Sequence, residues 1–196
     1  MSEKIVFATN NAHKLEELRE IAGSRLDILS LNDIDCHDDI PEDADTLRGN
    51  AIAKAMWVTE RYGLACFADD TGLEVDALGG APGVHSARYA PGKGHDSQAN
   101  MRLLLENMKN VPSERRTARF RTVMALVYPG QEPECFEGVV EGSIADAPMG
   151  DGGFGYDPVF VPDGWNKSFG QASADEKNAI SHRGRATAKL IVRLLG

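Results

Sequence analysis

Two long strand-like runs near the middle of this 196-residue chain constrain its fold more than any other feature. They are ARFRTVMALVY at 118–128 and CFEGVVEGSI at 135–144, and the segment PGQEPE at 129–134 joins them. Two such runs, separated by a few residues that include Gly and Pro, are typical of an antiparallel hairpin. Any sheet in this protein therefore has to contain a long hairpin.

The chain before this hairpin alternates between strand-like and helix-like segments. We predict strands at KIVFAT (4–9), LDILSL (26–31) and LACFAD (64–69), and helices after Asn10 or Asn11 and at 45–62. Asn10 or Asn11 is a suitable N-cap for the first helix, and Gly23 is a suitable C-cap. Units of this parallel type followed by a hairpin predict an α/β fold with a mixed β-sheet and flanking helices.

The other segments are shorter or less regular. Residues 32–44 are acidic and irregular, 78–94 form a Gly- and Pro-rich loop, and a helix is expected near 97–109. The stretch GDGGFGYDPVF (150–160) is a Gly-rich loop that enters a short strand, and the last 25 residues are mostly helical. With 42% hydrophobic residues the chain can bury one sizeable core, so we expect a single domain over residues 1–196.

Net charge limits the classes of partner. The formal charge of −9 argues against binding to nucleic acid or to an anionic membrane surface. Cys36, Cys66 and Cys135 lack metal-ligand spacing and fit free thiols in a reducing compartment. MSEKIVFATNN has no cleavage-site pattern, and the apolar runs are too short to span a membrane. We therefore expect a cytoplasmic protein.

Two lysines lie where a phosphate group would explain them. Lys14 falls in the first turn of its helix, where the helix dipole disfavours a cation but the backbone N–H groups attract an anion. Lys54 borders the apolar row of the helix at 45–62. The alternatives are an ordinary solvated lysine for Lys14 and a side chain that snorkels to solvent for Lys54.

Carboxylates form a second group of candidates, at Glu42, Asp43 and Asp45 and at the adjacent pair Asp69 and Asp70. Because a strand alternates its faces, the two adjacent aspartates should point to opposite sides. One or two carboxylates together with substrate phosphates are the usual ligands of Mg²⁺. The alternative is an Asx-type turn in which Asp70 binds backbone N–H groups near Thr71 and Gly72.

The loop GGFGYDP offers features that suit a nucleobase. Its glycines allow close approach of the backbone, and Phe154 or Tyr156 provides a face for stacking. Asp157, expected to be extended before Pro158, provides a fixed acceptor. The alternative is a tight turn that packs its aromatic side chains into the core.

The segment SADEKNAISHRGRA brings further cations to a helix start. Ser173 and Glu176 match a capping box, and a break is expected at Ser181. Lys177, His182 and Arg183 lie around that break. The alternative is surface charge, which we accept for Arg185 and Lys189. Taken together, the cations, carboxylates and aromatic loop suit a nucleoside triphosphate with Mg²⁺.

Four motifs then resemble the inosine triphosphate pyrophosphatase family, also called HAM1/RdgB-like. They are TNNAHK, FADDTGLEVDALGGAPGVHSARYA, GGFGYDPVF and EKNAISHRGRA, in the family's order from the first strand to the last helix. The resemblance implies hydrolysis of non-standard purine nucleoside triphosphates (dITP, ITP and XTP) to the monophosphate and pyrophosphate. It also implies Mg²⁺ dependence, a homodimer, and an elongated sheet with a central active-site cleft between two lobes.

The resemblance also implies roles for individual residues. The triphosphate would be held by Thr9, Asn10, Asn11, Ala12, His13, Lys14 and Lys54. Asp70 is similar to the family's catalytic carboxylate, Glu42 and Asp70 to its Mg²⁺ ligands, and Thr71 to a substrate contact. The base and sugar end would be held by Phe154, Gly155, Tyr156, Asp157, Lys177, His182 and Arg183.

These roles lead to a hypothesis for the reaction. A water oriented by Asp70 attacks the α-phosphorus, while Lys14 and Lys54 offset charge on the leaving pyrophosphate. Donors from His182 or Arg183 aimed at O6 would reject adenine by leaving buried groups unpaired. Two alternatives stay open, a Maf-type pyrophosphatase for modified nucleotides and a nucleotide-binding regulator without catalytic activity.

Overall fold

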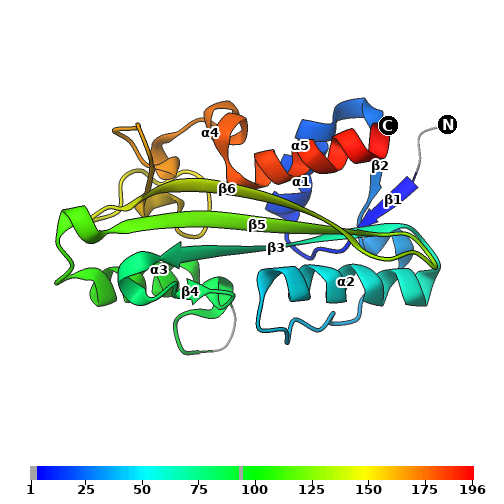
Figure 1. The fold of residues 1–196 in the computed structure, drawn as a ribbon, viewed down its shortest axis with the longest axis horizontal. Helices are drawn as coiled ribbons and strands as arrows, with labels where there is room; N and C mark the ends of the chain where they lie inside the picture. Colours follow the sequence, from blue (N-terminus) through cyan, green and yellow to red (C-terminus); the bar gives the residue numbers. More distant parts are fainter. Residues whose placement is uncertain (1–3, 93–94) are drawn as a thin grey trace. The chain divides into compact units, whose positions relative to one another are not determined.

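A computed structural model describes residues 4–92 and 95–196 (Figure 1). Lys93 and Gly94, which end the loop expected at 78–94, lie outside the described residues. The chain divides into two compact units. Unit 1 consists of Met1–Asp70, Thr122–Gly138 and Arg183–Gly196, and unit 2 consists of Thr71–Arg121 and Val139–His182. The single domain expected over residues 1–196 stays a prediction.

One mixed sheet contains the seven strands found among the described residues, and this confirms the predicted α/β class. The strands are β1 (Lys4–Phe7), β2 (Asp27–Leu29), β3 (Cys66–Val75), β4 (Pro82–Gly83), β5 (Thr117–Val127), β6 (Glu134–Ile144) and β7 (Phe160–Pro162). Their order is β2-β1-β3-β5-β6-β7, with β4 paired to β3. Strand β1 is parallel to β2 and β3, whereas the β3–β4 and β6–β7 pairs are antiparallel.

The long hairpin predicted in the middle of the chain is present. Strands β5 and β6 are neighbours in the sheet, and only residues 128–133 separate them. A parallel crossover needs a dozen or more residues, so this connection requires the two strands to run antiparallel.

Strand β3 is longer than the run predicted at 64–69. It begins at Cys66 and continues to Val75, because Leu73 and Val75 are buried in the core of unit 2 and Leu73 and Glu74 pair with β4. Asp69 and Asp70 therefore lie in the middle of a strand. The Asx-type turn considered near Thr71 and Gly72 is wrong.

Five α-helices accompany this sheet among the described residues. They are α1 (Ala12–Ala22), α2 (Leu47–Tyr62), α3 (Ser97–Met108), α4 (Ala174–Ile180) and α5 (His182–Leu195). Asn11, one of the two residues predicted as the N-cap, caps α1 by accepting the N–H of Lys14 with its side chain. Ser173 and Glu176 form the predicted capping box of α4, and Ser181 is extended between α4 and α5. None of the described helices is long and apolar enough to cross a membrane.

Unit 1 covers both faces of its strands with helices. Figure 1 shows α1 and α5 on one face and α2 on the other. Leu18 of α1 and Leu190 of α5 pack with Phe7 and Phe67 in one buried cluster. On α2, the fully buried Ala51 and its neighbours Ala55 and Val58 face inward. A polar side chain on the buried side of α1, α2 or α5 is therefore held close to the strands.

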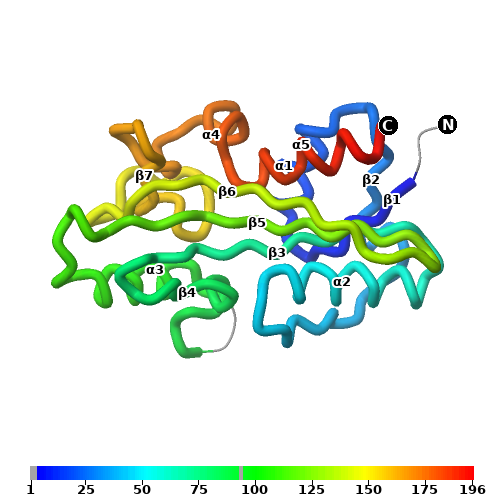
Figure 2. The backbone as a smooth tube through the Cα atoms, viewed as in Figure 1, coloured from blue at the N-terminus to red at the C-terminus, as the bar shows by residue number. Residues whose placement is uncertain are grey.

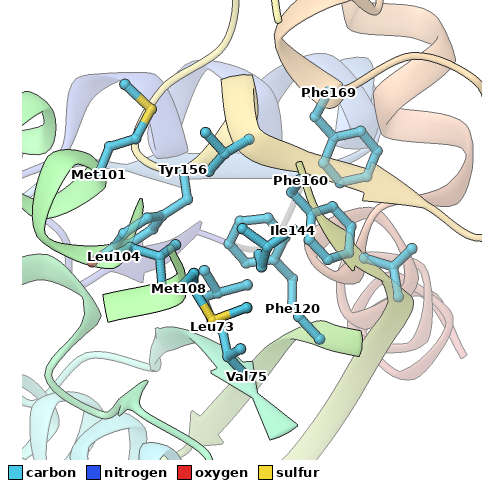
Figure 3. Close-up of a cluster of buried hydrophobic side chains, with 13 residues drawn as sticks. Leu73, Val75, Met101, Leu104, Met108, Phe120, Ile144, Tyr156, Phe160 and Phe169 are labelled. Atoms are coloured by element: carbon cyan, nitrogen blue, oxygen red, sulfur yellow. The ribbon is translucent and has the colours of Figure 1, made fainter. Parts of the chain in front are cut away.

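Unit 2 has its own aromatic core, shown in Figure 3. Phe120 of β5 packs against Phe160 in a tilted arrangement with ring centroids 4.6 Å apart, and it stacks on Phe169 with ring centroids 6.3 Å apart. Leu73 and Leu104 belong to the same cluster. Figure 2 shows β7 beside β6, where Ile144 pairs with Phe160. This core supports the loop at 150–157 that precedes β7.

Candidate functional site

The loop after β1 is fixed by hydrogen bonds from its own side chains. Thr9 Oγ1 accepts the N–H of Asn11 at 3.1 Å, and Asn11 Oδ1 accepts the N–H of Lys14 at 3.2 Å. Asn10, Ala12 and His13 are exposed. The segment 9–14 thus presents the first turn of α1 in a defined conformation, which suits an anion.

Lys14 is not the solvated lysine considered as an alternative. Its side chain is only 16% exposed, and its Nζ lies 3.0 Å from Asp69 Oδ2. Burial lowers the pKa of Lys14, and the charge of Asp69 offsets only part of this effect. The first turn of α1 is therefore tied to β3 by a buried ion pair.

Arg183 joins the same ion pair from α5. Its Nε lies 3.6 Å from Asp69 Oδ2, and its Nη1 donates to Glu17 Oε2. Burial alone would raise the pKa of Asp69, but the charges of Lys14 and Arg183 outweigh it and hold that pKa below its usual range. Asp69 is thus a buried anion that joins α1, β3 and α5.

Asp70 points to the other face of β3, as the alternation predicted. Its Oδ2 accepts Asn50 Nδ2 of α2 at 3.0 Å, and its Oδ1 lies 4.0 Å from Lys54 Nζ. Lys54 Nζ also donates to Glu42 Oε1 at 2.6 Å. Lys54 is only 7% exposed, so the snorkelling alternative is wrong.

The electrostatics of this face differ from those around Asp69. Burial raises the pKa of Asp70, and the charge of Lys54 and the hydrogen bond from Asn50 offset only part of the effect. Burial would lower the pKa of Lys54, but Asp69, Asp70 and Glu42 outweigh it and raise that pKa. An ammonium group therefore lies between two carboxylates at neutral pH.

Asn50 is not among the site residues predicted from the sequence, but it donates a hydrogen bond to one of them. Its Nδ2 donates to Asp70, and its Oδ1 accepts the N–H of Ala44 at 2.9 Å. Asn50 therefore ties the loop that carries Glu42 to the strand that carries Asp70. In the sequence, Asn50 is a polar residue next to apolar Ala51, one turn before Lys54 in the predicted helix, and this position could have indicated a buried polar contact. In the structure Asn50 is only 3% exposed.

The Glu42 and Asp70 carboxylates fit a magnesium ion. Both approach one cation, Lys54 Nζ, and carboxylate oxygens are the ligands that Mg²⁺ prefers. No group of three or more His, Cys, Asp or Glu side chains suitable for a metal occurs in the described part of the chain. A metal held here needs further oxygen ligands, which triphosphate groups provide.

We refer to Lys14, Glu17, Glu42, Lys54, Asp69, Asp70 and Arg183 as the charged cluster. All seven residues belong to unit 1. The four carboxylates outnumber the three cations. An anionic ligand at this cluster therefore has to bring a cation with it.

The loop at 153–157 in unit 2 is held by a second buried ion pair. Asp157 Oδ2 accepts Lys177 Nζ at 2.8 Å and the N–H of Phe154 at 2.9 Å. Asp157 begins a short 3₁₀ turn through Pro158 and Val159, so the extended conformation expected before Pro158 is wrong. Its carboxylate is turned back onto its own loop.

The aromatic residues of this loop divide into two kinds. Tyr156 is 5% exposed and its hydroxyl donates to the carbonyl of Ser86 at 2.7 Å, so the alternative of core packing holds for Tyr156. Phe154 is half-buried, with Lys177 Nζ 4.5 Å from its ring centroid. Gly155 has a φ of +62°, and the place of a Cβ there is open space.

His182 and Thr71 also belong to unit 2. The His182 ring stacks on Phe120 with centroids 4.7 Å apart. Thr71 is half-buried and follows Asp70 in β3. We refer to Phe120, Phe154, Asp157, Lys177 and His182 as the aromatic cluster. The structure thus places His182 in this cluster and the adjacent Arg183 in the charged cluster.

Comparisons of this chain with known proteins all point to the same family. A model described as the Ham1 family matches residues 5–193. A dITP/XTP pyrophosphatase of Porphyromonas gingivalis is 55% identical over 96% of this chain and 95% of its own. One of Flavobacterium johnsoniae is 48% identical over 96% of each. The structure of the Staphylococcus aureus Ham1 protein superimposes with a TM-score of 0.89 at 35% identity, covering 98% of each chain.

Proposed function

The chain belongs to the Ham1 family, and we propose that it hydrolyses non-standard purine nucleoside triphosphates such as dITP, ITP and XTP. The products would be the nucleoside monophosphate and pyrophosphate. Relatives named dITP/XTP pyrophosphatase, 55% and 48% identical, support this reaction. The observation that carries it is the convergence of Glu42, Lys54 and Asp70 on one face of β3.

We propose that the triphosphate binds to the charged cluster and to the first turn of α1. The N–H groups of that turn and the cations Lys14 and Lys54 would contact phosphate oxygens. Glu42 and Asp70 would hold a Mg²⁺. When bound, this ion supplies positive charge that stabilises the phosphate oxygens and the leaving pyrophosphate.

In the proposed reaction Asp70 orients the attacking water. Asn50 holds one oxygen of the Asp70 carboxylate, which fixes its direction. The water oxygen bonds to the α-phosphorus, the bond from that phosphorus to the bridging oxygen breaks, and the water proton passes to Asp70. Lys14 and Lys54 then neutralise charge on the departing pyrophosphate.

The base would bind to the aromatic cluster. Phe154 offers a partly exposed ring for stacking, and the open space beside Gly155 allows close approach of the backbone. Thr71, Asp157, Lys177 and His182 complete this end of the proposed site, together with Arg183 of the charged cluster, while Tyr156 supports the loop from the core. The expected cleft between two lobes and the homodimer are part of the same proposal.

The test is pyrophosphate release from a panel of ITP, dITP, XTP, GTP, ATP and modified pyrimidine triphosphates with Mg²⁺. We expect rapid release from the first three and slow release from GTP and ATP. Preference for modified nucleotides would instead indicate a Maf-type enzyme. Binding of ITP without release of pyrophosphate would indicate a regulator and would overturn the proposal.

A further inference from the structure

Lys54 lies where the proposed metal would bind. Its Nζ is 2.6 Å from Glu42 Oε1 and 4.0 Å from Asp70 Oδ1. Its side chain is 9% exposed, so it is a built-in part of this face. The ammonium group therefore neutralises the same two carboxylates that would neutralise a Mg²⁺.

We propose that Lys54 keeps the metal site closed until a nucleotide arrives. This inference rests on the proposed function, because it assigns a regulatory role within the same site. A divalent ion that enters alone has to displace an ammonium group from Glu42 and is then repelled by it. A metal–triphosphate complex brings phosphate oxygens that give Lys54 a new partner, so metal binding depends on nucleotide.

Asp70 and the loop that carries Glu42 each have a hydrogen-bond partner other than Lys54. Lys54 reaches Glu42 with a long flexible side chain, whereas Asp70 is held independently by Asn50. Asn50 also holds the Glu42 loop through the N–H of Ala44. The Asp70 carboxylate and the loop backbone at Ala44 therefore keep a hydrogen-bond partner when the ammonium group moves away from Glu42.

The test measures metal binding in the absence of turnover. Mn²⁺ is titrated into wild type and Lys54→Met, with electron paramagnetic resonance reporting free Mn²⁺. Without nucleotide we expect Lys54→Met to bind Mn²⁺ roughly tenfold or more tightly than wild type, since a nearby positive charge is removed. With an inosine triphosphate that carries an imido group between the α- and β-phosphorus, wild type should bind Mn²⁺ tightly.

Lys189→Met is the matched control. It removes one positive charge from an exposed position on α5 of the same unit and should leave Mn²⁺ affinity unchanged. Circular dichroism checks the fold, and Lys54→Gln replaces Lys54→Met if the latter does not fold. Unchanged or weaker Mn²⁺ binding by the Lys54 variant would overturn the proposal. So would saturable micromolar Mn²⁺ binding by wild type without nucleotide.

The proposed function can fail separately from this inference. Pyrophosphate release is measured in the substrate panel, whereas the Mn²⁺ titration needs no turnover. An inactive protein whose Lys54→Met variant gains Mn²⁺ affinity would reject the function and support the role of Lys54. An active protein whose Lys54→Met variant gains no Mn²⁺ affinity would support the function and reject the role of Lys54.

Discussion

The charged cluster of unit 1 and the aromatic cluster of unit 2 both contain buried ion pairs, but they balance charge differently. In the aromatic cluster one lysine meets one carboxylate, and Asp157 and Lys177 are both nearly inaccessible to solvent. In the charged cluster several carboxylates and cations share partners, and one of the carboxylates, Asp70, is 14% exposed. A matched pair is suited to hold a loop, whereas a shared set with surplus carboxylates can exchange partners.

The same contrast separates the two adjacent aspartates of β3. Asp69 has a lowered pKa and is enclosed by Lys14 and Arg183. Asp70 has a raised pKa and contacts an amide and the more distant Lys54. We therefore expect Asp69 to act on stability and Asp70 to act on chemistry.

The largest effect is expected from Asp70→Asn. The substitution keeps the shape of the side chain but removes the negative charge that we propose orients the water, so kcat for dITP should fall roughly 10³-fold. Stability should change little, because Asp70 is partly exposed. The measurement is steady-state pyrophosphate release together with a urea unfolding curve. A kcat near that of wild type would show that another group orients the water.

Asp69→Asn should act mainly on folding. It leaves Lys14 and Arg183 buried with less compensation, which should lower the free energy of unfolding at pH 7 by about 4 kcal/mol. Urea unfolding of both proteins measures this difference. A loss below about 1 kcal/mol would mean that the ion pair contributes little.

The pH dependence of this difference gives a second check. The folded-state pKa of Asp69 is lowered, so its contribution is fully present above the unfolded value of about 3.9 and is lost as pH falls toward the folded value. The difference between wild type and Asp69→Asn should therefore be constant from about pH 7 to pH 5 and shrink below about pH 4. A difference that grows on acidification contradicts this assignment.

Lys177→Met tests the matched pair of the aromatic cluster. It leaves the Asp157 carboxylate buried without its ammonium partner and should cost about 3 kcal/mol of stability. The KM for dITP should rise because the loop that carries Phe154 loosens. Adding Asp157→Asn in a double variant should recover part of the stability. Additive losses in the double-mutant cycle would show that the two residues do not act as a pair.

Much of the fold follows from local signals in the sequence. The hairpin, the cap at Asn11, the capping box at Ser173 and the break at Ser181 each depend on a few neighbouring residues. The alternation of a strand likewise predicted the opposite directions of Asp69 and Asp70. The extension of β3 beyond Asp70 could not be predicted, because its pairing with β4 is a tertiary contact.

The partners of the site residues were harder to predict than the residues themselves. Nothing in the local sequence indicates that Lys14 reaches across 55 positions to Asp69, or that Arg183 meets Glu17 across 166 positions. His182 and Arg183 belong to different clusters because the boundary between the two compact units falls between these two residues in the chain, at the start of α5. Such contacts depend on how helices and strands pack in three dimensions. Patterns among neighbouring residues do not determine that packing.

The smallest effect is expected from Asn50→Ala. It removes the amide that joins the Asp70 carboxylate to the loop carrying Glu42, so both proposed metal ligands lose their fixed positions. We expect kcat to fall about tenfold and stability to fall by about 1–2 kcal/mol. The Mg²⁺ concentration for half-maximal activity should rise.

Asn107→Ala provides the matched control for Asn50→Ala. Asn107 also lies on a helix and donates a hydrogen bond from its amide, to the hydroxyl of Tyr89, but it does so in an exposed position. This variant should keep the Mg²⁺ requirement of wild type. If both variants raise that requirement equally, the effect comes from general loss of stability. If only Asn50→Ala raises it, Asn50 positions the pair of carboxylates that distinguishes the charged cluster from the aromatic one.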